Sequence, residues 1–70
     1  MSQHATGTKD KDYNLISVLY HALSGAHSCI QFQEDAKREN DDQVVKFMAE
    51  AQEQYRALAE KAKQLLGTRL

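Results

Sequence analysis

The stretch RENDDQVV, residues 38–45, interrupts an otherwise continuous helical pattern and therefore decides the fold. Asn40 can cap a helix, and Gln43 stands three residues later, which is the spacing of a capping box. Asp41 and Asp42 would lie at the positive end of the new helix dipole, where carboxylates stabilise a helix. The stretch predicts that one helix ends at about residue 38 and that a second begins at about residue 41.

On both sides of this break the sequence favours long helices. The chain contains no proline, and strong helix formers dominate residues 12–66. Asp12 or Asn14 can cap the first helix, which we expect over about 13–38. Gly67 is predicted to end the second helix, over about 41–66, by adopting the left-handed conformation.

Residues 1–11 differ from the rest because they are polar and show no apolar periodicity. Such a composition is typical of a disordered terminal arm. The chain is therefore predicted to consist of this arm and one helical domain over residues 12–70.

The apolar residues of each predicted helix form a stripe when they are placed at about 100° per residue. In the first helix the stripe covers more than half of the circumference, and a single neighbouring helix covers only a narrow seam. The first helix therefore needs at least two neighbours. The predicted core or dimer face consists of Ile16, Leu19, Leu23, Ile30, Val44, Phe47, Met48, Ala51, Tyr55, Leu58, Ala62 and Leu65.

Two helices of nearly equal length, about 39 Å each, joined by a few residues must form an antiparallel hairpin. A chain of 70 residues with one cysteine has no internal disulfide to stabilise a small core. No cysteine and histidine cluster has zinc-site spacing either. The predicted fold is all-α: an antiparallel two-helix hairpin that forms a homodimeric four-helix bundle.

Composition excludes several classes of function. Nine basic and ten acidic residues are interspersed, so no basic surface for nucleic acid is predicted. No apolar run approaches the roughly 20 residues of a membrane span, and the N-terminus lacks the apolar segment of a secretory signal. The single cysteine agrees with a cytoplasmic location, which is the predicted one.

His27 and Glu34 are the candidate metal ligands, because they lie seven residues apart along one edge of the first stripe. Seven residues span about 10.5 Å, too far for one ion within one chain, but a two-fold axis could bring two copies together. We predict instead that His27 is a packing-face residue hydrogen-bonded to Tyr55 or to its symmetry mate, that Glu34 is solvated, and that neither binds a metal ion. Cys29 is predicted to be a buried small hydrophobe, because no aligned base accompanies it. No catalytic residue is predicted.

Residues 13–66, YNLISVLYHALSGAHSCIQFQEDAKRENDDQVVKFMAEAQEQYRALAEKAKQLL, resemble a small ferritin-like, rubrerythrin-like hairpin of bacterial proteins. The resemblance implies a four-helix bundle in which an inward Glu and a Glu-x-x-His motif hold two metal ions. Ser28 or His27 occupies the place of the first Glu, and Glu53 is followed by Arg56, whose guanidinium cannot bind a metal. A ferritin-type diiron site is therefore not predicted.

These observations predict a non-enzymatic helical dimerisation or interaction module that works as a homodimer without a cofactor. The alternative is a metal-binding or metal-storage protein of the ferritin-like type. It would hold iron, zinc or manganese in a site across the dimer axis.

Overall fold

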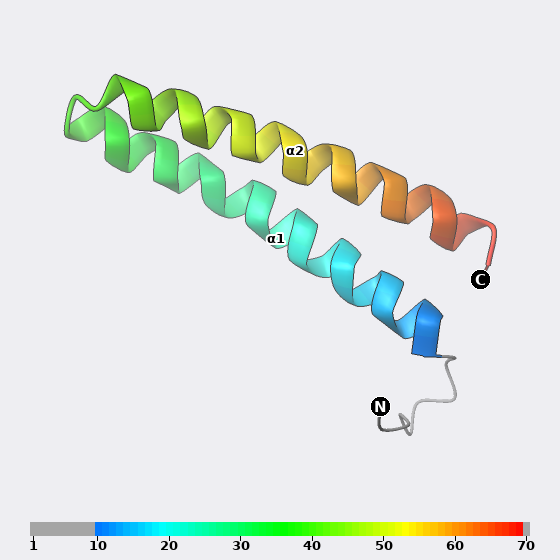
Figure 1. Cartoon of the computed structure of the whole chain (residues 1–70). Helices are drawn as coiled ribbons and strands as arrows, with labels where there is room; N and C mark the ends of the chain where they lie inside the picture. Colours follow the sequence, from blue (N-terminus) through cyan, green and yellow to red (C-terminus); the bar gives the residue numbers. More distant parts are fainter. Residues whose placement is uncertain (1–9, 70) are drawn as a thin grey trace.

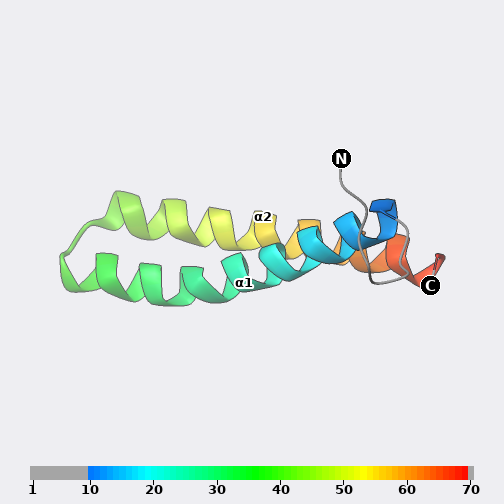
Figure 2. The ribbon, with the colours of Figure 1, turned by 90° about the horizontal axis from the view of Figure 1, so that it is seen from below.

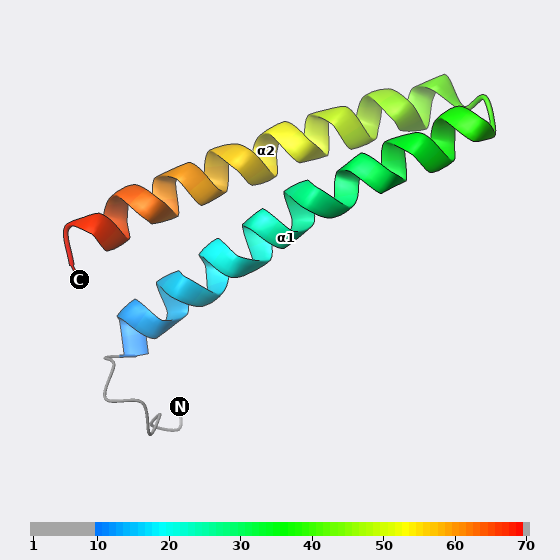
Figure 3. The same ribbon diagram turned by 180° about the vertical axis from the view of Figure 1, so that it is seen from behind.

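The computed structural model describes residues 10–69, which form two antiparallel helices lying side by side (Figure 1). Helix α1 spans Asp10–Arg38, helix α2 spans Asp42–Gly67, and no strand occurs within these residues. The view from behind shows the same single layer of two helices (Figure 3). The predicted all-α helical hairpin is confirmed for this part of the chain.

The helices are joined at one end, and we call the opposite end, where α1 begins and α2 ends, the open end (Figure 1). Figure 2 shows that the helices are inclined, so that α1 crosses α2 towards the open end. Helix α1 begins at Asp10, a little before the predicted residue 13, and carries Asp10 and Asp12 in its first turn. Carboxylates there favour helix formation. Of the predicted N-terminal arm, residues 1–9 lie outside the described residues.

The end of α1 is closed by Asn40, which has a left-handed φ of 59°. The Asn40 N–H donates to the Lys37 carbonyl at 3.0 Å, and the Asp41 N–H donates to the Ala36 carbonyl at 3.0 Å. This pair of bonds is a Schellman motif, in which asparagine can replace the usual glycine. The motif reverses the chain within three residues.

The N-cap of α2 is Asp41, and the predicted capping box of Asn40 and Gln43 is wrong. The Asp41 carboxylate accepts a hydrogen bond from the Val44 N–H at 3.2 Å. Asn40 cannot serve both helices, because the left-handed conformation that ends α1 differs from the conformation of an N-cap residue. Asp41 therefore serves as the N-cap of α2.

The prediction that Gly67 ends α2 in the left-handed conformation is also wrong. Gly67 is the last helical residue, and Thr68 follows in a right-handed conformation with a φ of −93°. The Thr68 hydroxyl donates to the Leu65 carbonyl at 2.9 Å, and the Arg69 N–H donates to the Leu66 carbonyl at 3.0 Å. Because these bonds satisfy the last carbonyls, no left-handed residue is needed.

The helices meet along a seam of small side chains. The buried apolar residues are Ala22, Ala26, Cys29, Ala36, Ala59, Ala62 and Leu66. Along each helix they follow the alternating spacing of three and four residues that is typical of a coiled-coil seam. Burial contributes about 0.8 kcal/mol per methylene and about 1.5–3 kcal/mol per large side chain, so an alanine seam stabilises the hairpin weakly.

One hydrogen bond between side chains crosses the seam. The Gln33 amide nitrogen donates to the Gln52 amide oxygen at 2.9 Å, and the pair is partly buried. A single polar pair at a seam position favours one register over its neighbours, because any slip leaves a partly buried amide unpaired. The pair therefore fixes how α1 and α2 align.

Gly25 lies in the middle of α1, where the ring of Tyr55 from α2 rests on its backbone. A Cβ at position 25 would lie 2.8 Å from Tyr55 Cε1 and Cζ and 2.9 Å from Cε2. From the sequence, the predicted compensation for this glycine is close approach of another helix, with simple tolerance of the glycine as the alternative. The group that approaches is the aromatic ring of Tyr55. Glycine here gives up about 1 kcal/mol of helix propensity and gains room for that ring.

The effect of Gly25→Ala on the free energy of unfolding should therefore have opposite signs in two backgrounds. In the wild type the added methyl group overlaps the Tyr55 ring and should lower the free energy of unfolding by about 1–2 kcal/mol. In a Tyr55→Ala background the same change should raise it by about 0.5–1 kcal/mol through helix propensity. Urea titrations of the four proteins at one concentration test this cycle, and equal effects in both backgrounds would contradict the packing described.

Candidate functional site

The large apolar side chains lie mostly outside the seam, with 39% to 66% of their surface exposed. A monomer normally buries such residues or scatters them singly over its surface. Here they form rows along both helices. The exposed large apolar residues are Tyr13, Ile16, Val18, Tyr20, Leu23, Ile30, Phe32, Phe47, Tyr55, Leu58 and Leu65.

Nine of these side chains fall on two sides of the hairpin, while Tyr13 and Tyr20 lie on the side of α1 that points away from α2. At about 100° per residue, Val18 and Phe32 lie on one side of the α1 seam, and Leu23 and Ile30 lie on the other. Val18 shares a hollow with Leu58 and Leu65 of α2, which identifies the side that both helices build. We call this side the two-helix face, and its large apolar residues are Val18, Phe32, Phe47, Tyr55, Leu58 and Leu65. The other side is the α1 face, with Ile16, Leu23 and Ile30.

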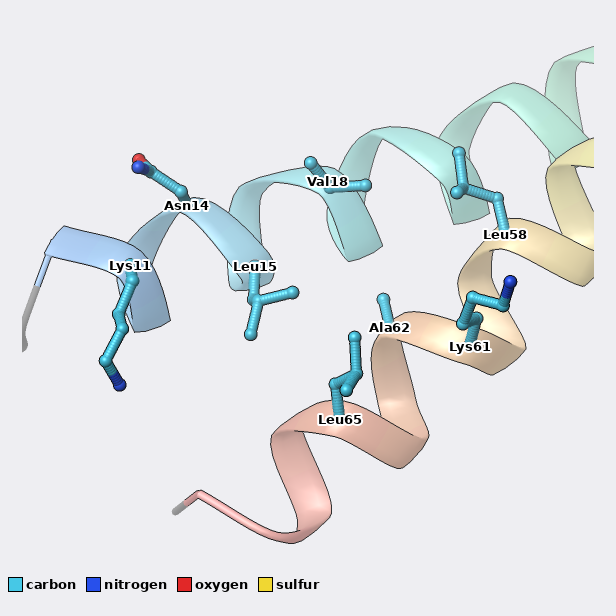
Figure 4. Close-up of a pocket in the computed structure, with 8 residues that line it drawn as sticks. All are labelled: Lys11, Asn14, Leu15, Val18, Leu58, Lys61, Ala62 and Leu65. Atoms are coloured by element: carbon cyan, nitrogen blue, oxygen red, sulfur yellow. The ribbon is translucent and has the colours of Figure 1, made fainter.

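The first hollow of the two-helix face lies at the open end and has a volume of about 330 Å³. Leu15 from α1 and Ala62 and Leu65 from α2 point into the space between the helices (Figure 4). Lys11 and Lys61 also line the hollow, so its rim is basic. The site is therefore an apolar groove between two cations.

A second hollow of about 300 Å³ lies on the same face at the loop end. Its apolar lining is Phe32, Ala36, Val44 and Met48, and its charged lining is Asp35, Glu39 and Asp41. The two ends of the two-helix face thus carry opposite charges.

Asp35 is held in its ionised form by its neighbours. The Gln31 amide donates a hydrogen bond to its carboxylate at 2.9 Å, and the Arg38 guanidinium forms an ion pair with it. These two contacts lower the pKa of Asp35 below its usual value, the Gln31 bond contributing most. Asp35 therefore stays ionised into mildly acidic solution.

The α1 face has a different character, because α2 adds charged residues to that side of the seam. Arg56 pairs with Glu53 at 3.7 Å, and Lys63 pairs with Glu60 at 3.2 Å. These ion pairs lie within one helix and are largely solvated, so they contribute little to stability. Only the two-helix face is apolar on both helices.

The predicted contact between His27 and Tyr55 does not form within the chain. Tyr55 packs on Gly25, and two residues of helix turn His27 by about 200° from Gly25. His27 is exposed on the opposite side, and among the described residues no hydrogen bond joins it to Tyr55. Glu34 is exposed, as predicted, and lies 3.8 Å from the Lys37 ammonium.

The other candidate residues lie where the pattern predicts. Cys29 is a buried free cysteine, and Glu53 points into solvent beside Arg56. Within residues 10–69 no group of three or more histidine, cysteine, aspartate or glutamate side chains is placed to hold a metal ion. His27 and Glu34 are not brought together with further ligands in a single chain.

His27→Gln and Glu34→Gln should each change the free energy of unfolding by less than about 0.5 kcal/mol, because both side chains are exposed. Chemical denaturation of the untagged proteins measures this. Elemental analysis of the same samples should find no stoichiometric iron, zinc or manganese. Metal that is present in the wild type and lost in both variants would establish a site across the dimer axis.

The rows of small residues and the charged rims are features that the sequence analysis does not identify. The alternation of three and four residues in Ala22, Ala26 and Cys29 is visible in the sequence as the signal of a seam. The rims have no such signal, because they combine residues from both helices.

Within the described residues neither helix is long and apolar enough to cross a membrane. Comparisons with protein-family models, with curated proteins and with solved structures find no match to this chain. The resemblance to ferritin-like hairpins therefore stays a prediction from the sequence.

Proposed function

We propose that this chain is a non-enzymatic helical association module that works as a homodimer, with two hairpins packed into a four-helix bundle. The observation that carries the proposal is the distribution of apolar side chains. The seam buries mainly alanines, whereas Val18, Phe47 and Leu58 remain exposed on one face. A second copy would cover that face and supply the large buried side chains that the hairpin lacks.

The size of the two-helix face supports this assembly. Its six large side chains are about half exposed and together present on the order of 600 Å² of apolar surface, taking roughly 200 Å² for each. A standard interface buries about 800 Å² per partner with an apolar centre and a polar rim. The apolar centre of the two-helix face together with its charged rims is comparable to such an interface in size and in layout.

The chemistry of the described residues supports a role without catalysis. A catalytic thiol needs a base within hydrogen-bond reach. Cys29 lies buried in the seam, whereas His21 and His27 are exposed on α1. The cytoplasmic location predicted from the single thiol is part of this proposal.

Thermal unfolding at several concentrations tests the proposal. For a dimer that folds as it associates, mass action raises the thermal midpoint with protein concentration. We expect a rise of several degrees between about 5 and 500 μM, followed by circular dichroism. A midpoint independent of concentration across this range would contradict homodimerisation.

A further inference from the structure

We propose that the two copies meet antiparallel through the two-helix face, so that the basic rim of each hairpin lies against the acidic rim of its partner. This inference rests on the proposed homodimer and specifies its face and orientation. The occupant of the groove between α1 and α2 is a second copy of this chain.

The two rims of the two-helix face carry opposite charges. Lys11 and Lys61 line the hollow at the open end, whereas Asp35, Glu39 and Asp41 line the hollow at the loop end. A parallel dimer would bring each rim against its own copy and place like charges together. An antiparallel dimer joins opposite charges at both ends.

This pattern of charges is self-complementary. A two-fold axis that crosses the middle of the face exchanges the two ends, so each favourable contact occurs twice. Lys11 and Asp35 already have ion-pair partners, Asp12 and Arg38. Lys61 of the basic rim and Glu39 and Asp41 of the acidic rim form no ion pair among the described residues, so charges of both signs are left for the partner.

A projecting side chain of each copy fits a hollow of the other in this arrangement. Phe47 is 60% exposed and lies on the loop half of the face. With the axis midway along α2, near Gln54, Phe47 comes level with residues 58–65 of the partner. The partner's hollow, lined by Val18, Leu58 and Leu65, lies at that level. An aromatic ring therefore meets an apolar recess in each half of the dimer.

Charge reversal tests the orientation. The basic-rim variant is Lys11→Glu with Lys61→Glu, and the acidic-rim variant is Asp35→Lys with Glu39→Lys. Each variant alone should raise the dissociation constant of its homodimer at least tenfold, because like charges face each other at both ends. An equimolar mixture of the two should return to within about threefold of the wild type, since both ends again join opposite charges.

The matched control is Arg56→Glu with Lys63→Glu, which makes the same change in net charge on the other side of α2. We expect a change in its dissociation constant of less than about threefold, since these charges are solvated. Sedimentation velocity dilution series give the constants, and circular dichroism verifies that every variant remains helical at high concentration.

The outcomes separate this inference from the proposed function. A wild type that stays monomeric overturns both. If the wild type is dimeric but each rim variant associates normally, the antiparallel arrangement is overturned and the homodimer stands. The same holds if the mixture of the two rim variants does not regain the dissociation constant of the wild type. If the control variant raises the dissociation constant as much as the rim variants do, the assignment of the interface to the two-helix face is overturned too.

Discussion

Replacing Leu58 with aspartate should dissociate the protein and leave a largely unfolded chain at micromolar concentration. Leu58 lines the hollow at the open end of the two-helix face and is 47% exposed in the single hairpin. In the proposed dimer it is buried, and a buried unpaired carboxylate costs several kcal/mol. We expect the free energy of association to fall by at least about 3 kcal/mol, which is more than a hundredfold in the dissociation constant.

Leu23→Asp is the matched control for this change. Leu23 is 49% exposed and lies on the α1 face, so the same change from leucine to aspartate can be made there at similar exposure. The sequence pattern alone predicts equal disruption at both positions, whereas the structure separates them. Leu23→Asp should keep the dimer and lose no more than about 1 kcal/mol of stability. Dissociation by Leu23→Asp with a dimeric Leu58→Asp would place the interface on the α1 face.

The second large effect on stability is expected from a substitution that widens the seam between α1 and α2. Ala59 is 2% exposed between the helices, and leucine there adds three carbons where the seam has no free space. Ala59→Leu should push α1 and α2 apart, displace the partly buried Gln33–Gln52 bond and lower the free energy of unfolding by about 3 kcal/mol.

Ala57→Leu is the control, because Ala57 lies exposed on the outer side of α2. Alanine and leucine are both strong helix formers, so this change should stay within about 0.5 kcal/mol. Chemical denaturation at one protein concentration compares the two variants. If both variants changed the free energy of unfolding equally little, the alanine seam would not be the contact between the helices.

The helices and their antiparallel arrangement could be predicted because those features depend on local pattern. Helix formers without proline and a polar break at residues 38–45 suffice for a hairpin. The exact caps could not be predicted. Asn40 and Asp41 are adjacent and can both cap a helix, and only the backbone reversal assigns the left-handed position to Asn40.

The position of the seam within the wide α1 stripe could not be predicted from hydrophobicity alone. Leu23 and Ile30 are more apolar than Ala22 and Ala26, yet the alanines face α2. Small residues allow two helices to approach closely, so size decides the seam where hydrophobicity does not. The predicted His27–Tyr55 contact does not form within one chain for the same reason, because Tyr55 packs on Gly25 at the other side of this seam.

The candidate site depends on both helices at once, which limits its prediction further. Lys61 and Lys11 become one basic rim only when α2 folds back along α1. Glu39 and Asp41 join Asp35 through the geometry of the Schellman turn. The charges were visible in the sequence, but their grouping at opposite ends of one face was not.

The most direct test of the account is the mass of the untagged protein in solution by sedimentation equilibrium at about 10–100 μM, a range in which a standard-size interface should be occupied. We expect a species of twice the 7.9 kDa chain mass with high helicity. A fully helical, cooperatively unfolding monomer over the whole range would contradict it, because the alanine seam would then suffice to hold the hairpin.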